Sequence, residues 1–259
     1  MNEKEINNFF PIPSQTSIID KYILLKINKF INLNIKDFIY LEIGSYLGGS
    51  LTPFLINKNC KRVISVDKRH QILQDERSEK WSYKKYSNNL MIKKLKENKL
   101  NINKLKSFDG DMSEYKSNEN YDIVFIDGIH TDKNTFSDFL YSFDRVKKNS
   151  IILFHDSTVI YKSLLLINEL LSKNKCKYKI FKFKNSGITG IFFGSFSKMN
   201  INKRIFPTQN FLKFCNKAEE NLLIQKLNNR IKIEFKISKF LKNKFPYKFK
   251  IKPEEKKLA

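Results

Sequence analysis

A regular alternation of short apolar runs with helix-like segments constrains the fold of this 259-residue chain more than any other feature. Apolar runs rich in β-branched and aromatic residues predict strands at residues 38–43, 62–66, 105–108, 121–126 and 151–154. Between them, helical periodicity marks residues 49–57, 88–98, 132–146 and 159–171. Strands that are apolar throughout and that alternate with helices predict an α/β fold, in which a doubly wound, mostly parallel sheet has helices on both faces.

Both ends of the chain depart from this alternation. Residues 17–31 predict an N-terminal helix, with Thr16 or Ser17 as its N-cap. Apolar runs at residues 177–183 and 188–193 have the spacing of a hairpin, so we expect the sheet to finish with an antiparallel strand. After residue 196 the chain is rich in lysine, with a predicted helix at residues 216–227 and an aromatic and basic segment at residues 235–251.

These features divide the chain into three parts. We expect an N-terminal helical extension (residues 1–34), a cofactor-binding domain (residues 35–196) and a basic, aromatic-rich C-terminal extension (residues 197–259). Two roles stay open for the last part: it packs on the domain as a cap, or it is a basic arm for a partner or a membrane surface.

The formal net charge of +23 has two explanations. It suits a polyanionic partner such as nucleic acid or an acidic membrane surface. The excess is mostly lysine and accompanies many asparagines and isoleucines, which is also the composition expected from an AT-rich genome. Arginine, the better side chain for bidentate phosphate recognition, is scarce. We therefore favour the compositional explanation and treat nucleic acid as the less favoured partner.

Several features predict a cytoplasmic protein. No apolar run approaches the roughly 18 residues of a transmembrane helix. The first ten residues lack the basic-then-apolar pattern of a secretory signal. Cys60, Cys176 and Cys215 are isolated and lack the spacing of metal sites, which is typical of reduced cysteines.

The most informative segment is residues 39–50, which read Ile-Tyr-Leu-Glu-Ile-Gly-Ser-Tyr-Leu-Gly-Gly-Ser and join a strand to a helix. In an open parallel sheet, ligands bind in the crevice at such a junction. The dinucleotide fingerprint requires a glycine where this chain has Tyr46, whose side chain would obstruct a pyrophosphate. Glu42, Gly44 and Gly48 instead suit a cofactor without phosphates, because a glycine lets the backbone approach the ligand and a carboxylate attracts a cationic amino acid moiety.

Acidic residues also follow the next two strands. Asp67 ends the second strand, where a carboxylate can accept hydrogen bonds from both ribose hydroxyls. Asp109, Gly110 and Asp111 follow the third strand, and a carboxylate there can bind the amino group of adenine. Acidic groups at successive strand ends, in this order, predict a site for S-adenosylmethionine.

At this point the sequence resembles the class I S-adenosylmethionine-dependent methyltransferases. Leu-Glu-Ile-Gly-Ser-Tyr-Leu-Gly-Gly-Ser, Ile-Asp-Gly-Ile-His and Ile-Ile-Leu-Phe-His-Asp resemble motifs of the methyltransferase 24 family, which is similar to macrolide-sugar and catechol O-methyltransferases. The resemblance extends over residues 35–195 and implies a Rossmann-like, seven-stranded methyltransferase fold with the last strand reversed. It also implies a cofactor pocket lined by Glu42, Gly44, Ser45, Asp67, Asp111 and Met112.

A second acidic constellation follows the last two predicted parallel strands. Asp127 and His130 follow one strand, and His155 and Asp156 follow the next, so neighbouring parallel strands would bring all four into one crevice. An alcohol acceptor loses its proton near the transition state of methyl transfer, and a base or a metal ion assists this loss. We expect His130 to be the base, with Asp127 beside it.

Asp127 and Asp156 can hold a divalent ion such as Mg²⁺ or Mn²⁺. The resemblance implies the same roles, since these two residues match metal-binding aspartates and His130 matches a proposed base. His155 departs from the family, where some relatives have an acidic residue, and an imidazole suits Zn²⁺, Mn²⁺ or Fe²⁺ better than Mg²⁺. The alternative is structural: His155 caps a strand and His130 lies on a solvated loop.

These observations predict O-methylation of a small hydroxylated acceptor such as a sugar or glycan precursor, although N-methylation of an amino sugar would use a similar sequence. We expect the N-terminal helix, residues 75–86 with Trp81, and the tail to select the acceptor. Two other functions stay open: methylation of an RNA hydroxyl, and a non-catalytic binding module on the same fold. A homodimer formed through the Phe-rich tail is a further expectation.

Overall fold

The computed structural model describes residues 1–198 and 207–244, and a large mixed sheet lies at its centre. The strand order is β10-β8-β9-β7-β6-β1-β2-β5. The strands are β1 (Phe38–Ile43), β2 (Cys60–Val66), β5 (Leu105–Phe108), β6 (Tyr121–Ile126), β7 (Val146–Phe154), β8 (Tyr178–Phe183), β9 (Thr189–Phe193) and β10 (Thr208–Gln209). All five predicted parallel strands are present, and β7 begins at Val146, where the periodicity predicts the end of a helix.

The direction of the strands confirms a Rossmann-like, mostly parallel sheet. Five strands, from β5 through β2, β1 and β6 to β7, pair in parallel. The hairpin prediction is also confirmed, because β9 lies between β7 and β8 and runs antiparallel to both. β10 adds an edge strand that pairs with β8, and its two residues are too few to show a sequence pattern.

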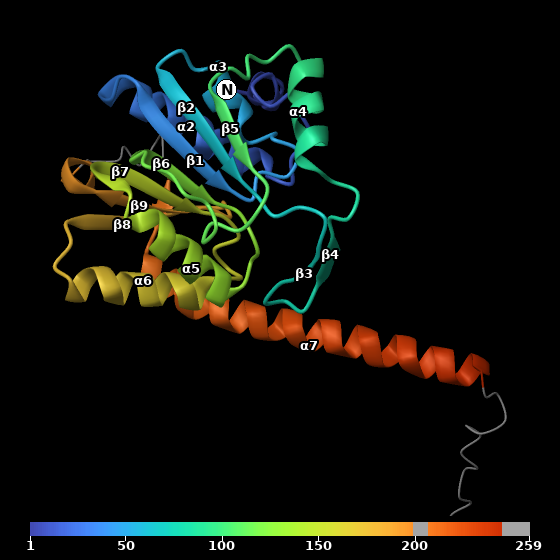
Figure 1. The fold of residues 1–259 in the computed structure, drawn as a ribbon. Helices are drawn as coiled ribbons and strands as arrows, with labels where there is room; N and C mark the ends of the chain where they lie inside the picture. The colour runs from blue at the N-terminus through green and yellow to red at the C-terminus, as the bar shows by residue number, and fades with distance from the viewer. Residues whose placement is uncertain (199–206, 245–259) are drawn as a thin grey trace, which may run out of the picture.

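Helices cover both faces of the sheet (Figure 1). α2 (Ile18–Asn34), α3 (Thr52–Ile56) and α4 (Asn88–Glu97) pack on one face, and α5 (Asp132–Phe143) and α6 (Tyr161–Lys173) pack on the other. Successive side chains of a strand point to opposite faces, so Tyr40 joins the first apolar cluster and Leu41 joins the second. Continuous apolar strands are therefore required, as the sequence indicated. A short helix, α1 (Glu3–Asn7), precedes α2, and a 3₁₀ helix (Gly194–Lys198) follows β9.

The C-terminal helix is much longer than its sequence pattern predicts. α7 extends over Phe211–Lys244, whereas the pattern indicates a helix only at residues 216–227. No glycine or proline occurs between residues 211 and 244 to end it. Its first turns pack on α6 through Cys215, Ala218 and Leu222, and the rest extends beyond the body (Figure 1). Of the predicted aromatic and basic segment, residues 245–251 lie outside the described residues. No helix within the described ranges is long and apolar enough to cross a bilayer.

A small hairpin projects between β2 and α4. It consists of β3 (Ile72–Gln74) and β4 (Lys80–Ser82), which pair antiparallel and form a sheet of their own. The sequence indicated only a loop at residues 75–86. The hairpin lies beside α7 in Figure 1, and hydrogen bonds join the two elements.

Candidate functional site

A cavity of about 640 Å³ opens at the carboxyl ends of the parallel strands. This volume lies within the range of small-molecule sites, and the position is the one expected for ligands in an open α/β sheet. The loops after β1, β2, β5, β6 and β7 all contribute to its lining, and so do residues 14–16 and the β3–β4 hairpin.

The glycine loop after β1 approaches the end of β6 closely. Gly44 has a φ of +86°, and a Cβ atom added there would lie 2.2 Å from the carbonyl oxygen of Asp127. Only glycine fits such a contact with a left-handed backbone. The loop can therefore pass directly beside Asp127, which brings the predicted cofactor loop and the predicted catalytic residues into one cavity.

Asp67, at the end of β2, is held by the glycine loop. Its Oδ2 accepts a hydrogen bond from the backbone N–H of Tyr46 at 2.7 Å and lies 3.4 Å from Arg69 Nη2. Burial raises the pKa of Asp67, although Arg69 and the Tyr46 N–H oppose this effect. Its Oδ1 atom is not used in these contacts, so the carboxylate retains acceptor capacity towards the cavity.

Arg69 is a site residue that sequence reasoning missed. Its side chain is 2% exposed. It donates to the backbone oxygens of Tyr46 and Asp67 and to Ser45 Oγ, at 3.2–3.3 Å. These bonds join the glycine loop to the end of β2. An arginine three residues after a strand gives no signal of this role, because only the folded loop brings its partners together.

The predicted cofactor residues separate into two groups. Gly44, Ser45, Asp67, Asp111 and Met112 line the cavity, and Lys68 Nζ lies 2.6 Å from the Asp111 carboxylate at its rim.

The other two predicted residues, Glu42 and Gly48, are not among the lining residues. Glu42 is fully buried, and its carboxylate accepts hydrogen bonds from Tyr40 and Ser50. Burial raises its pKa to about 8 despite these two bonds. In this arrangement Glu42 holds β1 and the loop together beneath the cavity.

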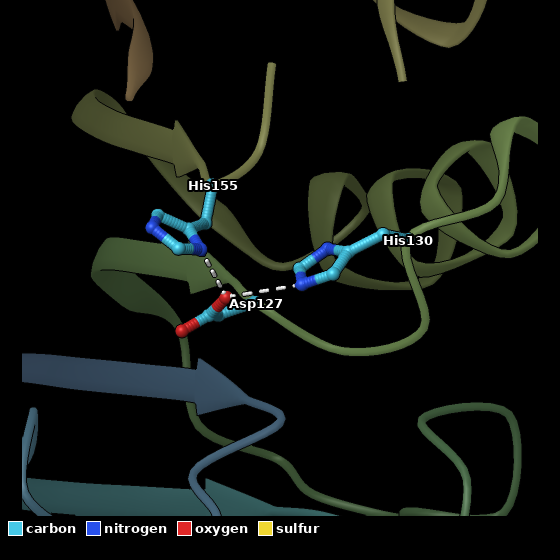
Figure 2. A group of neighbouring side chains, drawn as sticks. All are labelled: Asp127, His130 and His155. Atoms are coloured by element: carbon cyan, nitrogen blue, oxygen red, sulfur yellow. Dashed lines mark ion pairs between the residues drawn. The ribbon is translucent and has the colours of Figure 1, made fainter. Parts of the chain in front are cut away.

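Asp127 lies between two histidines, His155 and His130 (Figure 2). Its Oδ1 is 2.7 Å from His155 Nδ1 and 3.8 Å from His130 Nε2. Asp156, at the end of β7, lies 3.6 Å from His130 Nε2 and 4.0 Å from His155 Nδ1. The structure thus brings together all four residues that the sequence placed in one crevice.

His155 is buried between two carboxylates. Its Nε2 is 3.4 Å from Asp20 Oδ2, and its Nδ1 faces Asp127. Burial alone would lower its pKa, but Asp127 and Asp20 hold the pKa well above its usual range. Burial would likewise raise the pKa of Asp20, but hydrogen bonds from His155, Ser17 and Ser186 hold it at about 2. Without a bound cation, His155 is therefore an imidazolium and Asp20 a carboxylate.

His130 is the neutral histidine of the site. Burial lowers its pKa, and the carboxylates of Asp156 and Asp127 only partly oppose this effect. A neutral imidazole that lines a cavity has a free lone pair, which can accept a proton or bind a metal ion.

Three donor atoms of the site suit a metal ion. The ligand atoms of Asp127, His130 and His155 lie within 4.8 Å of one another. The sequence instead predicted Asp156 as a metal ligand and His130 as the base. His155 Nδ1 is buried and, although 2.7 Å from Asp127, makes no directed hydrogen bond. A buried imidazole nitrogen whose one close neighbour is the oxygen of a carboxylate fits a metal ligand. The mixture of nitrogen and oxygen atoms suits Mn²⁺, Fe²⁺ or Zn²⁺ better than Mg²⁺.

The β3–β4 hairpin completes the wall of the cavity. Arg77 lies between Asp75 and Asp156, at 2.6 and 3.3 Å, and was not identified from the sequence. Trp81 and Tyr83, also on this wall, line the cavity, and Trp81 Nε1 donates to Asp75 at 3.3 Å. Tyr83 packs edge-on against Tyr46 of the glycine loop. The hairpin therefore supplies an aromatic surface within the segment, residues 75–86, that the sequence assigned to acceptor selection.

The cavity lining is acidic although the chain is strongly basic. Its lining includes Asp67, Asp75, Asp111, Asp127, Asp138 and Asp156, against Lys68, Arg69 and Arg77. Each of these three cations lies within 3.4 Å of an aspartate of the same lining. The lining therefore favours neutral or cationic ligands over anionic ones.

Comparison with known proteins gives a family match for the central part of the chain. Residues 41–157 match the family Methyltransf_24, described as a methyltransferase domain. This segment begins in β1 and ends just after Asp156, so it contains the glycine loop, Asp67, Asp127 and both cavity histidines. No curated protein matches the chain in a sequence search.

Solved structures share the fold at low sequence identity. The O-methyltransferase NovP is 11% identical, with a TM-score of 0.53 over 74% of this chain and 87% of that one. Rv0187 from MTB, solved with its cofactor, has the same identity and coverage and a TM-score of 0.52. An O-methyltransferase from Bacillus cereus, in complex with SAH, is 13% identical, with a TM-score of 0.50 over 73% and 88% of the two chains.

Proposed function

We propose that the chain, whose residues 41–157 match a methyltransferase domain family, uses S-adenosylmethionine to methylate a hydroxyl group of a small, uncharged acceptor such as a sugar. The observation that carries this proposal is the cavity itself. It joins the glycine loop and Asp67 to a pair of histidines and to an aromatic wall. A single ligand site of this kind has room for a cofactor and an acceptor side by side.

The residues that would hold the cofactor are those at the ends of β1, β2 and β5. Asp67 has an oxygen available for the ribose hydroxyls, and the Asp111 and Met112 segment would flank the adenine. Gly44 and Ser45 lie where the backbone can approach the amino acid moiety. S-adenosylmethionine supplies a methyl group on a positively charged sulfonium, and the acidic lining favours that charge.

His130 would remove the acceptor proton. As the acceptor oxygen forms its bond to the methyl carbon, the carbon–sulfur electron pair stays with sulfur and the hydroxyl proton moves to His130 Nε2. Asp127 and Asp156 lie 3.8 and 3.6 Å from that nitrogen, so their charges stabilise the imidazolium that forms. Such a general base contributes about 10²–10⁴ to the rate.

Asp127, His155 and Asp156 would hold a divalent ion of the Mn²⁺, Fe²⁺ or Zn²⁺ type. When bound, such an ion acidifies a coordinated hydroxyl group. We propose Asp156 and not His130 as the third ligand because His130 Nε2, which faces Asp127 and Asp156 at 3.8 and 3.6 Å, is the proton acceptor of the proposed reaction. His130 cannot use Nε2 both to bind the ion and to accept the proton. The His130→Ala variant distinguishes these two roles, because only the loss of a ligand would weaken metal binding.

The acceptor is proposed from the wall that faces the histidines. Trp81, Tyr83 and Tyr46 offer apolar ring surfaces, and Gln15 and Arg77 offer polar atoms nearby. Aromatic faces beside hydrogen-bonding groups are suited to a sugar ring. A phosphate-rich acceptor such as RNA would meet the acidic lining, which makes RNA methylation the weaker alternative despite the basic exterior.

Calorimetric titration with S-adenosylmethionine and S-adenosylhomocysteine, with Mn²⁺ or with chelator, tests the proposal. We expect micromolar binding. Asp67→Asn should weaken it at least tenfold, which corresponds to about 1.4 kcal/mol for a lost charged hydrogen bond. Asp144→Asn, an aspartate after α5 that lies outside the cavity lining, is the matched control and should bind normally. No binding under any metal condition would refute the cofactor site.

A further inference from the structure

Asp20 is a buried carboxylate that the proposed chemistry does not use directly. It lies in the first turn of α2, 3% exposed, on a segment that precedes the methyltransferase domain. Ser17 already caps the helix, since its Oγ accepts a hydrogen bond from the backbone N–H of Asp20. Helix capping therefore does not explain why a carboxylate is buried here, and burying a charge is costly unless it is fully paired.

Both oxygens of Asp20 are used. Oδ1 accepts hydrogen bonds from Ser186 Oγ at 2.5 Å and from the backbone N–H of Gly187 at 2.8 Å. Oδ2 accepts from Ser17 Oγ at 2.6 Å and lies 3.4 Å from His155 Nε2. Three segments thus meet at this carboxylate: the start of α2, the turn between β8 and β9, and the end of β7.

The turn that carries Ser186 and Gly187 is itself fixed. The buried Lys182 donates from Nζ to the backbone oxygens of Phe183 and Ile188, each at 3.1 Å, and to that of Ser186. Its ammonium also lies 4.8 Å from the ring centre of Phe214 in α7. Asp20 is consequently held by a rigid turn on one side, and it can in turn hold His155.

The orientation of the His155 ring depends on these contacts. With Nε2–H directed at Asp20, the other nitrogen, Nδ1, faces Asp127 and has no directed hydrogen bond. A metal-binding histidine usually donates its second N–H to a carboxylate, which fixes the tautomer and makes the ligand nitrogen more basic. The arrangement of Asp20, His155 and Asp127 has this form.

We propose that Asp20 is a positioning residue, which holds His155 with Nε2–H donated to its carboxylate and Nδ1 presented to the cavity as a donor to a divalent transition metal. This inference rests on the metal site of the proposed function and goes beyond it, because it makes the N-terminal helix and the β8–β9 turn parts of the site. The site would then be incomplete in a chain reduced to the matched domain, residues 41–157.

Mn²⁺ binding, followed by the electron paramagnetic resonance of the free ion, tests this without turnover. Asp20→Asn keeps the size of the side chain, but an amide has a single acceptor oxygen and cannot serve both the turn and His155. We expect 10- to 100-fold weaker Mn²⁺ binding, the usual cost of losing such a partner. Ser186→Ala, which removes one donor to Asp20, should weaken binding less.

Asp122→Asn is the matched control. Asp122 is also buried, but it lies in β6 and accepts from the backbone N–H of Ile39 and from Lys147, near the other end of the strand. This variant should lose stability and keep wild-type Mn²⁺ affinity. A second readout is the ring ¹⁵N spectrum of the three histidines in the Zn²⁺-loaded protein, where a metal-bound His155 retains one N–H and Asp20→Asn should shift it away from the Nε2–H form.

The outcomes are distinct. Wild-type Mn²⁺ affinity in Asp20→Asn would overturn the positioning role, and so would equal losses in Asp20→Asn and Asp122→Asn. If the wild-type protein binds S-adenosylmethionine and no Mn²⁺, the metal site and this inference both fail while the methyltransferase proposal stands. If it binds Mn²⁺ and no S-adenosylmethionine, the cofactor proposal fails and Asp20 is still judged by its own variant.

Discussion

Two histidines that flank one aspartate have opposite protonation because their surroundings differ. His155 has a carboxylate at each ring nitrogen, which holds its pKa high, whereas burial dominates at His130 and lowers its pKa. The same residue type is therefore a charged group on one side of Asp127 and a neutral imidazole on the other.

His130→Ala tests the role of the second histidine. We expect turnover to fall by about 10²–10⁴, the usual contribution of a general base, with unchanged affinity for S-adenosylmethionine and Mn²⁺. Steady-state kinetics and titration calorimetry measure the two quantities. His70→Ala is the control, because His70 is exposed and its ring contacts only the backbone oxygen of Lys84 among the hydrogen bonds described. A loss of Mn²⁺ affinity in His130→Ala would make His130 a ligand instead.

Glu42 gives a prediction for stability against pH. Burial raises its folded-state pKa to about 8 from an ordinary value of 4.5, so the folded state binds a proton that the unfolded state has lost. Its contribution to the free energy of unfolding is therefore complete below the ordinary value and falls as pH rises towards about 8. Glu42→Gln should flatten this fall in urea unfolding between these pH values. Glu220→Gln, on the exposed surface of α7, should not.

At the scale of elements, α7 contacts the β3–β4 hairpin, which lines one side of the cavity. Lys226 Nζ lies 3.4 Å from Glu76, and Asn229 donates to the backbone oxygen of Arg77 at 2.9 Å. On its other side the hairpin joins the site, because the Glu76 N–H donates to the backbone oxygen of His130 at 3.1 Å. The long helix that the periodicity did not fully predict is thus connected to the hairpin residues that line the cavity.

Removing these contacts should loosen the hairpin. In the double variant Lys226→Ala, Asn229→Ala, we expect faster amide exchange at residues 75–82 and a higher KM for the acceptor, with unchanged cofactor affinity. Hydrogen exchange with mass spectrometry reports the first effect. Lys217→Ala, an exposed lysine on the same helix, is the control. Equal exchange in all three proteins would show that α7 does not restrain the hairpin.

At the scale of the whole molecule, charge is distributed unevenly. The chain has a formal net charge of +23, yet its cavity lining has more aspartates than lysines and arginines. A charge of this size destabilises the compact state by self-repulsion, and salt screens that repulsion. The basic exterior therefore favours anionic ligands, whereas the acidic cavity favours cationic ones.

We expect the melting temperature to rise when NaCl increases from low concentration to about 0.15 M, where the screening length is near 8 Å. Differential scanning calorimetry measures the shift. Extensive acetylation of surface lysines, which removes their charge, should abolish most of the salt response. A melting temperature that falls with NaCl would mean that attractive ion pairs, not repulsion, dominate the surface.

Local patterns determined the strands and most helices of this protein. Apolar runs fix which segments are buried on both sides, and β1, β5 and β6 have the bounds that their sequences predict. Strand order is also restricted by the pattern, since parallel strands with helical connections have few ways to pack. For the same reason the strand pattern by itself places Asp67, Asp127, His130, His155 and Asp156 at one edge of the sheet.

Only the tertiary structure decided which side chains contact each other there. Asp20 and His155 are 135 residues apart in the sequence, and their contact depends on how α2 packs on the sheet. The roles of Arg69, Arg77 and Glu42 likewise depend on loop conformations and burial, which the periodicity of the sequence does not predict. Periodicity records whether a residue faces water or the core, whereas the partner of a buried charge is set by the packing of elements distant in the chain.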